Sequence, residues 1–389
     1  MKILHFIPSV DPAAGGPAEG LKQFCSIYRM GGHEVEVASL DSPEVIEQVE
    51  FPAKVFGLGP GRGVYGYSPH ALPWLKANVR SYDVVLINCI WQYNAVAAYR
   101  ALKGTGKPYA VLVHGMLDPY FKHRYPLKHL KKSIYWHTVL RQILANAAGV
   151  LFTCEEEKIL ARQSFSRYKV REMVVSYGSF GPDTDLVAAR DEFLERWPHL
   201  RGKRLAVTLG RIHPKKGTDI LIEAFAATLA KDEAWRLVIA GPDQIGWQKE
   251  LEALAAKLGV GGRITWTGML KGAPKWGALA ASEVFLLPSH QENFGIAVAE
   301  ALACRLPVIL STKVNTWREI VGSSAGFAGD DTLPATTASF ERWMTLSGDE
   351  IAAMRQRARE CFDRCFNFET TARRTLEIVQ YVAAQGRPE

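Results

Sequence analysis

Residues 284–300 of this chain read VFLLPSHQENFGIAVAE. The four apolar residues at 284–287 predict a buried strand, and the Pro-Ser-His-Gln segment after them predicts a turn. A helix is expected at about 297–303, and Gly295 just before it leaves the backbone N–H groups of the helix start open to close approach. A buried strand that leads through a turn into a helix is typical of parallel α/β sheets, in which ligands lie at the carboxyl ends of the strands.

Two glutamates lie eight residues apart in this segment. Glu292 lies in the loop, and Glu300 lies about one and a half turns into the expected helix. Carboxylates near a helix start can accept hydrogen bonds from hydroxyl groups, and a sugar and a ribose are polyhydroxylated groups that would use two separated acceptors. The spacing leaves an alternative open, in which Glu292 only caps the helix and Glu300 is a solvated helix residue.

The same alternation of apolar strands and helical segments extends along the chain in both directions. Strands are expected in the first half at 2–7, 34–39, 83–88, 109–114, 149–153 and 172–175, and in the second half at 205–209, 236–240, 264–266, 284–287 and 307–310. Helices separate these strands, which predicts parallel sheets joined by right-handed crossovers. The expected fold class is therefore α/β, with two doubly wound, Rossmann-like domains.

The length of the chain also favours two domains. Its 389 residues exceed what one hydrophobic core usually serves. The best candidate linker is Gly178-Ser179-Phe180-Gly181-Pro182, which is rich in residues that break regular structure. We therefore expect one domain over residues 1–180 and a second over 181–369, with the ends of their strands directed toward a shared cleft.

Two further loops follow predicted strands and could contact phosphate. The segment Gly210-Arg211-Ile212-His213-Pro214-Lys215-Lys216-Gly217 comes directly after a strand, and its Arg211 and Lys216 suit the oxygens of a diphosphate. The segment Gly15-Gly16-Pro17-Ala18 opens a helix, so its backbone could approach a phosphate closely. The alternatives are a solvated basic loop and an ordinary tight turn, because neither segment is a P-loop or a dinucleotide-binding fingerprint.

A histidine ends one of the predicted strands. His114-Gly115 follows the apolar run at 109–113, and Asp118 comes four residues later. A single histidine at the end of a strand is more often structural than catalytic. Its place at a carboxyl end, which faces the expected cleft, makes His114 a candidate for contact with a ligand.

Taken together, these four elements resemble those of the retaining glycosyltransferases of family 4, which have the GT-B fold. The resemblance covers nearly the whole chain, and its G-R-x-x-x-x-K-G and E-x7-E elements, at 210–217 and 292–300, occur in the family's order. The chain departs from the family pattern at its linker and at Arg305, where the family usually has glycine. The resemblance implies a GT-B fold with a last helix, at about 370–389, that returns to the N-terminal domain.

The resemblance also implies a reaction and roles for individual residues. The enzyme would transfer a hexose from a nucleoside diphosphate sugar to an acceptor hydroxyl, with retention of configuration, in the synthesis of a bacterial exopolysaccharide, O-antigen or related glycan. Glu292 would hold hydroxyls of the donor sugar, and Glu300 would hold the ribose. Arg211 and Lys216 would neutralise the leaving diphosphate, and His114 would contact the sugar near the reacting centre.

Six further residues would contact the donor by the same resemblance. The N–H of Gly16 would meet the distal phosphate. The backbone of Asn293, Phe294 and Gly295 would cradle the sugar, and Gly268 and Met269 would lie near the base. No metal and no cofactor are expected, because none of the four elements contains a D-x-D pair. A UDP-sugar is expected ahead of a GDP-sugar as the donor. The alternative function is a nucleotide-sugar epimerase of the same fold, which would turn over its donor without an acceptor.

The excess positive charge of the chain lies in its first half. Residues 1–180 contain 21 Lys and Arg against 14 Asp and Glu, whereas residues 181–389 contain 26 of each. The stretch 119–154 has no acidic residue and interleaves cations with aromatic side chains. This composition suits contact with an anionic membrane that carries a glycan or lipid-linked acceptor, although a solvated basic face whose aromatic side chains pack inward is the alternative. No recognised motif predicts a nucleic acid as a partner.

The overall composition is that of an ordinary globular protein, with 48% apolar and 22% charged residues. No run of 18 apolar residues predicts a membrane span, and residues 2–7 predict a first strand rather than a signal peptide. Six cysteines without a pairing pattern fit a reducing compartment. The expected location is the cytoplasm, either free or at the inner face of the membrane.

Overall fold

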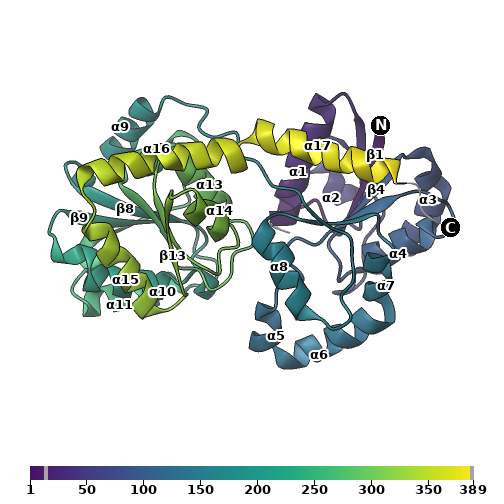
Figure 1. The fold of residues 1–389 in the computed structure, drawn as a ribbon, viewed down its shortest axis with the longest axis horizontal. Helices are drawn as coiled ribbons and strands as arrows, with labels where there is room; N and C mark the ends of the chain where they lie inside the picture. The colour runs from purple at the N-terminus through teal and green to yellow at the C-terminus, as the bar shows by residue number, and fades with distance from the viewer. Residues whose placement is uncertain (13–15, 386–389) are drawn as a thin grey trace. The chain divides into compact units, whose positions relative to one another are not determined.

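The computed structural model describes residues 1–12 and 16–385. Gly15 of the predicted glycine turn therefore lies outside the described residues. The chain forms two compact units, one made of Met1–Gly178 together with the segment from Thr371 onward, and one made of Ser179–Thr370. Each unit contains one parallel sheet with helices packed on it (Figure 1).

The N-terminal unit contains a seven-stranded parallel sheet in the order β3-β2-β1-β4-β5-β6-β7. Its strands are β1 Lys2–Ile7, β2 Glu34–Ser39, β3 Lys54–Gly57, β4 Val84–Asn88, β5 Tyr109–Leu112, β6 Gly149–Phe152 and β7 Glu172–Val174. Its helices are α1 Gly16–Met30, α2 Pro43–Glu47, α3 Ala71–Asn78, α4 Tyr93–Leu102, α5 Tyr120–Arg124, α6 Pro126–Tyr135, α7 Arg141–Ala145, α8 Glu155–Ser164 and α17 Phe368–Ala384. A π-helical turn over Trp136–Leu140 joins α6 to α7.

The C-terminal unit contains a six-stranded parallel sheet in the order β10-β9-β8-β11-β12-β13. Its strands are β8 Arg204–Leu209, β9 Trp235–Ala240, β10 Ile264–Gly268, β11 Val284–Leu287, β12 Val308–Ser311 and β13 Gly326–Gly329. Its helices are α9 Leu186–Arg196, α10 Thr218–Ala227, α11 Gln248–Lys257, α12 Ala273–Ala280, α13 Ile296–Ala303, α14 Trp317–Gly322, α15 Leu333–Met344 and α16 Gly348–Cys365. Short 3-10 turns cover Pro198–Leu200, Pro214–Lys216, Leu229–Lys231 and Gly261–Arg263 in this unit and Val79–Ser81 in the N-terminal unit.

In both sheets the strand order reverses next to the first strand of the unit, at β1 and β4 in one sheet and at β8 and β11 in the other. The expected fold class, two doubly wound α/β units, is thereby confirmed. Two strands, β3 and β13, were not predicted from the sequence. Both are edge strands of four residues; β3 is exposed or half-buried throughout, and β13 is half-buried at its last two residues. They therefore lack the continuous apolar run that marks the buried parallel strands.

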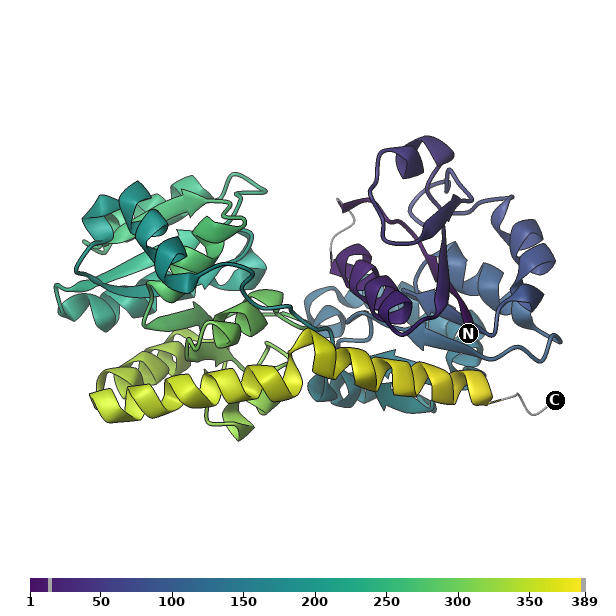
Figure 2. The ribbon, with the colours of Figure 1, turned by 90° about the horizontal axis from the view of Figure 1, so that it is seen from above.

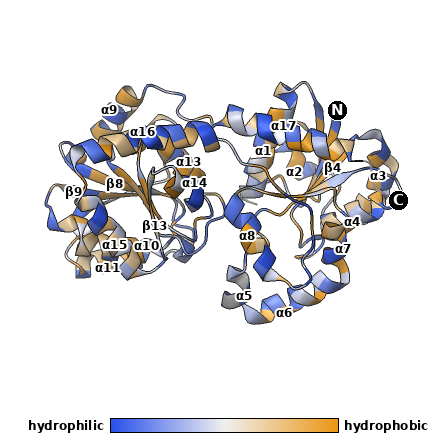
Figure 3. Cartoon of the chain, in the orientation of Figure 1, coloured by the Kyte–Doolittle hydropathy of each residue, from blue (hydrophilic) through white to orange (hydrophobic). Residues whose placement is uncertain are grey.

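Each unit has its own hydrophobic core. The strands beside the reversal points are almost completely buried, as in β4 and β11, and large side chains such as Trp136 in the first unit and Trp235 in the second are inaccessible to solvent. The strands are mostly apolar, whereas the helices that cover them carry polar residues on their outer faces (Figure 3). The packed core of each unit therefore holds the carboxyl ends of its strands in fixed positions.

Helix α17 packs on the N-terminal unit, although it begins at Phe368 (Figure 2). A Cβ placed on Gly31 would lie 2.9 Å from a methyl group of Leu376, and Val382 lies beside Gly149 of β6. Glycines at these two positions let the helix approach the rest of the unit closely. Within the described residues, no helix is both long and apolar enough to cross a membrane.

Candidate active site

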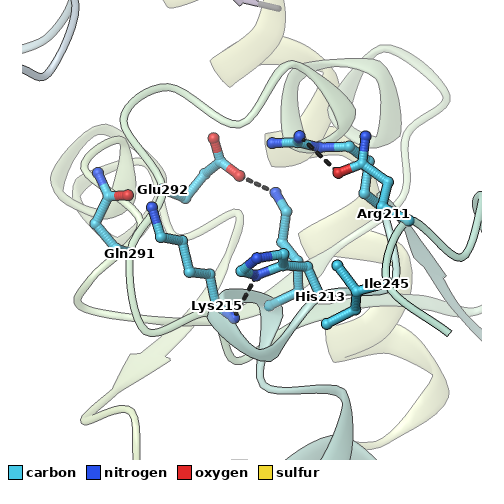
Figure 4. A pocket seen from close by; sticks show the side chains of 8 residues that line it. Arg211, His213, Lys215, Ile245, Gln291 and Glu292 are labelled. Carbon is cyan, nitrogen blue, oxygen red and sulfur yellow. Dashed lines mark hydrogen bonds and ion pairs between the residues drawn. The ribbon is translucent and has the colours of Figure 1, made fainter. Parts of the chain in front are cut away.

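A cavity in the C-terminal unit lies where β8, β9 and β11 end. Its volume is about 470 Å³, and it is lined by Arg211, His213, Lys215, Lys216, Gln244, Ile245, Gln291 and Glu292. These residues lie in the loops that follow the three strands, and the strand order reverses at β8 and β11. A reversal point of this kind is where doubly wound sheets bind ligands. Figure 4 shows the labelled side chains gathered around the cavity, with three cations and one carboxylate among the residues that line it.

Glycines fix the loop after β8 against its neighbours. Gly217 has a left-handed backbone, with a φ of 63°, and a Cβ there would lie 2.2 Å from the carbonyl oxygen of Pro288 in the loop after β11. A Cβ on Gly241, in the loop after β9, would lie 1.7 Å from the carbonyl oxygen of Gly210. Only glycine allows the three loops to approach each other this closely.

Lys216 and Glu292 form an ion pair across the cavity. Glu292 is held in place by its backbone, because its N–H donates to the carbonyl of Lys313 at 2.9 Å and its carbonyl accepts from the N–H of Asn315 at 3.0 Å. The cation expected to meet a diphosphate and the carboxylate expected to meet a sugar are therefore direct neighbours.

The rest of the loop after β8 carries positive charge. Arg211 donates from Nη1 to the side-chain oxygen of Gln244 at 2.9 Å, which orients its guanidinium along the cavity. The pKa of His213 is lowered by burial and then by the charges of Lys215, Arg211 and Lys216. The three cations that line the cavity produce a local positive field, which disfavours protonation of His213 and attracts anions.

Glu300 lies on α13 and pairs with Lys275 at 2.5 Å, and the ammonium group of Lys275 also lies 4.1 Å from the ring centre of Trp276. Glu300 is not among the residues that line the cavity. Its carboxylate is mostly buried and already paired. Its predicted contact with a ribose stays a prediction.

The other predicted donor contacts of this unit lie close to α13 and at the end of β10. Gly295 caps α13 with a left-handed φ of 73°, and Phe294 is buried and packs edge-on against Phe366. The amide of Asn315 donates to the side-chain oxygen of Asn293 at 3.4 Å. These contacts leave the backbone, rather than the Phe294 ring, as the part of this segment that could meet a sugar.

Gly268 ends β10 with a left-handed φ of 68°, and its carbonyl accepts from the N–H of Gly241 at 2.8 Å. Met269 follows it and is exposed. Neither residue lines the cavity. Their predicted place near the base therefore stays a prediction.

The cavity thus brings together three of the predicted residues, Arg211, Lys216 and Glu292. Gln244 and Ile245, which lie in the loop after β9 and carry no charge, were not predicted from the sequence. Their place in the loop that follows a predicted strand was the one signal that could have found them. Among the described residues, no cluster of three or more His, Cys, Asp or Glu side chains could hold a metal ion.

The two predicted residues of the N-terminal unit also lie at strand ends. Gly16 begins α1, and a Cβ placed on it would meet no atom within 4 Å. His114 and Gly115 form a tight turn after β5, because both have positive φ values, of 49° and 74°, and the N–H of Met116 donates to the carbonyl of Val113 at 3.0 Å. Positive φ is uncommon for histidine and calls for support from the surroundings.

Hydrogen bonds supply that support and fix the state of the His114 ring. The amide nitrogen of Asn88 donates to the carbonyl of Leu86 at 3.2 Å and to Nδ1 of His5 at 3.0 Å, which leaves its side-chain oxygen to accept from Nε2 of His114 at 3.1 Å. Nε2 of His114 therefore carries the proton, and Nδ1 accepts from the hydroxyl of Tyr177 at 2.5 Å.

His114 is therefore neutral, and both of its ring nitrogens have partners within its own unit. Burial lowers its pKa to about 4, and burial together with the neighbouring His114 lowers the pKa of His5 to about 3. Contact between His114 and a donor sugar stays a prediction. It would require the ring to exchange a partner or the turn to offer its backbone.

We predict that the protein loses stability as the pH falls through the range from about 6.5 to 4. The unfolded chain protonates His114 near pH 6.5, whereas the folded chain does so only near pH 4, so the unfolded state binds more protons between these values. The full effect is about 3 kcal/mol for this residue. Urea unfolding at several pH values, compared between the wild type and His114→Asn, measures it; asparagine tolerates the left-handed backbone.

The pH dependence of His114→Asn should be shallower than that of the wild type. Carboxylates contribute equally to both proteins, so the difference between the two slopes reports His114 together with its effect on the pKa of the neighbouring His5. Equal slopes between pH 6.5 and 4 would show that His114 is not held neutral.

Two family models match most of this chain. Residues 189–360 match the family described as "Glycosyl transferases group 1", and residues 15–178 match a "Glycosyl transferase 4-like domain". The structure of HepE from Anabaena in complex with UDP and glucose aligns over 98% of this chain and 99% of that one, with a TM-score of 0.74 and 18% identity. At that identity the likeness supports the fold alone.

Two curated relatives are transferases by name. The GDP-mannose:cellobiosyl-diphosphopolyprenol alpha-mannosyltransferase of Xanthomonas campestris is 26% identical over 80% of this chain and 78% of its own length. The lipopolysaccharide core biosynthesis mannosyltransferase LpsB of Rhizobium meliloti is 28% identical over 39% of each chain, so that match spans well under two thirds of the relative. Because the two family matches together span most of the sequence, the chain belongs to the group 1 glycosyltransferases, of GT-B fold.

Proposed function

We propose that this protein transfers a sugar from a nucleoside diphosphate sugar to an acceptor hydroxyl, with retention of configuration. The observation that carries the proposal is the cavity at the ends of β8, β9 and β11, which places Arg211, Lys215 and Lys216 beside the carboxylate of Glu292. Cations suit a diphosphate, and a carboxylate suits the hydroxyls of a sugar. The name of the family supports the same reaction.

In this proposal the protein stabilises the negative charge that develops on the leaving group. The acceptor oxygen forms a bond to the anomeric carbon while the bond to the diphosphate oxygen breaks, and the acceptor proton passes to the departing phosphate. Negative charge develops on the diphosphate, where Arg211 and Lys216 would stabilise it without reorganisation. Because the side chain of Gln244 already orients Arg211, that stabilisation would be in place before the bond breaks.

The ion pair between Lys216 and Glu292 gives the two residues linked roles. When a diphosphate takes up the charge of Lys216, the carboxylate of Glu292 becomes available to accept hydrogen bonds from the sugar. Each charge thus has a partner before and after the donor binds, which avoids a charge left unpaired in a partly enclosed site. The nucleotide and the sugar would then bind together more tightly than either alone.

The donor and the pathway belong to the proposal as well. We expect a UDP-sugar, ahead of a GDP-sugar. HepE was solved with UDP, whereas the name of the Xanthomonas relative specifies GDP-mannose. The names of the relatives point to lipopolysaccharide or diphosphopolyprenol-linked glycans as the class of product.

We predict that Arg211→Ala lowers turnover at least tenfold and leaves the fold intact. Loss of one preorganised charged contact to the leaving group costs on the order of 2.7–4 kcal/mol of the barrier. The measurement is nucleotide release from a panel of UDP- and GDP-sugars. Lys249→Ala removes an exposed cation from α11 of the same unit and serves as the matched control.

Lys249→Ala should match the wild type. Equal turnover in the wild type and Arg211→Ala would remove Arg211 from the site. Unfolding curves establish that both variants are folded before their rates are compared.

A membrane-bound acceptor fits the surface of α6. Most of the aromatic side chains nearby do turn inward, since Trp136 is fully buried and Tyr135 is partly buried. The helix nevertheless exposes Leu127, Leu130 and Ile134, which are 79%, 61% and 62% accessible. Their spacing of three and four residues places them on one face of the helix.

Cations surround this apolar face. Lys128 and Lys131 lie on the same helix, and Arg124 precedes it. Apolar side chains flanked by lysines on a short helix are typical of contact with anionic lipid, which would bring the protein to a lipid-linked acceptor. We therefore propose peripheral contact with the inner face of the membrane through α6.

We predict that the wild type cosediments with vesicles that contain phosphatidylglycerol and not with pure phosphatidylcholine vesicles, and that salt weakens the binding. The triple variant Leu127→Ser, Leu130→Ser and Ile134→Ser should bind at least tenfold more weakly, because each buried leucine or isoleucine contributes about 1.5–3 kcal/mol. Val187→Ser, at an exposed apolar position of α9, is the control and should bind as the wild type does. If the wild type cosedimented with neither kind of vesicle, this role of α6 would be contradicted.

A further inference from the structure

The loop after β3 crosses the ligand-binding edge of the N-terminal sheet. Residues 58–70 read LGPGRGVYGYSPH. The N–H of Gly61 donates to the carbonyl of Leu40, just after β2, at 2.9 Å, and the carbonyl of Tyr65 accepts from the N–H of Tyr93, at the start of α4, at 2.8 Å. The loop therefore runs from the edge strand to the point beside β4 where the strand order reverses. That reversal point is the place where a doubly wound sheet binds its ligand.

Glycines and a short hairpin make this loop rigid. Arg62 and Tyr67 exchange two backbone hydrogen bonds, of 2.8 and 3.2 Å, and Gly63 and Gly66 between them have positive φ values of 63° and 68°. A Cβ on Gly59 would lie 2.0 Å from the carbonyl oxygen of Leu40. The conformation of the loop is thus fixed by its own backbone.

This rigid loop holds two tyrosine rings in solvent. Tyr65 and Tyr67 are 38% and 46% accessible, and the buried ring of Tyr93 supports both, with centroid distances of 5.9 and 4.9 Å. The hydroxyl of Tyr65 also lies 3.3 Å from the hydroxyl of Tyr135. Aromatic rings that are held in place yet left exposed are a common feature of binding surfaces, because little entropy is lost when a ligand covers them.

The tyrosines adjoin the turn that carries His114. The ring of Trp91 packs against Tyr135, with a centroid distance of 6.2 Å, and its Nε1 donates to the carbonyl of Met116 at 3.2 Å. Met116 closes the turn at His114. The exposed rings therefore belong to the same edge of the sheet as the predicted contact with the reacting centre, and we assign them to a substrate rather than to a partner protein.

We propose that Tyr65 and Tyr67, supported by Tyr93, form a platform on which a sugar ring of the acceptor stacks. A pyranose has an apolar face of C–H groups and a rim of hydroxyls, and a tyrosine offers an apolar ring face with a hydroxyl at its edge. The acceptor is therefore a saccharide, and its hydroxyl is presented from this edge of the sheet. The inference rests on the proposed transfer reaction and names the class of its second substrate.

The first test measures saccharide binding without turnover. Saturation-transfer NMR with methyl mannoside, methyl glucoside and cellobiose should show contact between at least one of them and the wild type. Tyr67→Ala should weaken this contact about tenfold, Tyr67→Phe should keep it, and Tyr381→Ala, which removes an exposed tyrosine from α17, should leave it unchanged. Equal signals from the wild type and Tyr67→Ala, or no signal from the wild type, would overturn the platform.

The second test follows nucleotide release from the donor in the presence of the same saccharides. The saccharide that binds should accelerate release, and Tyr67→Ala should raise the concentration needed for half-maximal acceleration about tenfold. Release that no saccharide accelerates would overturn the platform while the transferase function stands. No release from any donor would contradict the proposed function, and the NMR titration would still decide whether the platform binds a saccharide.

Discussion

The ion pair between Lys216 and Glu292 joins two loops that are far apart in the sequence and that together form the cavity of the C-terminal unit. It forms because Gly217 brings the loop after β8 against the carbonyl of Pro288, which no other residue type would permit. The parallel sheet fixes the ends of both strands, the glycine fixes the loops, and the ion pair fixes the two charges. The position of the two charges therefore depends on the contact made by the glycine, and that contact depends on the fixed ends of the strands.

The two units use strand ends in different ways. In the C-terminal unit the loops present cations to a cavity, and burial followed by these positive charges lowers the pKa of His213. In the N-terminal unit the corresponding edge carries a neutral histidine, held by Asn88 and Tyr177, and exposed aromatic rings. Positive charge suits the diphosphate of a donor, whereas neutral polar and aromatic groups suit a saccharide. The chemistry of each edge thus matches one of the two substrates of a glycosyl transfer.

Much of this arrangement could be predicted from the sequence, because it follows from patterns of neighbouring residues. Buried parallel strands are continuous apolar runs, and Arg211, Lys216 and Glu292 lie in the loops that follow such runs. The partners of His114 could not be predicted, since Tyr177 is 63 residues away from it and Asn88 is 26. The exposed tyrosines after β3 were missed for a related reason: β3 is short and partly exposed, so the loop that follows it had no recognisable strand before it.

A crystal structure of the protein with UDP bound would test the role of the ion pair. We predict that the diphosphate lies in the cavity at the ends of β8, β9 and β11, within hydrogen-bond distance of Arg211 and Lys216, and that the carboxylate of Glu292 is separated from Lys216. A diphosphate bound away from both cations, or bound while the ion pair stays intact, would contradict the central claim.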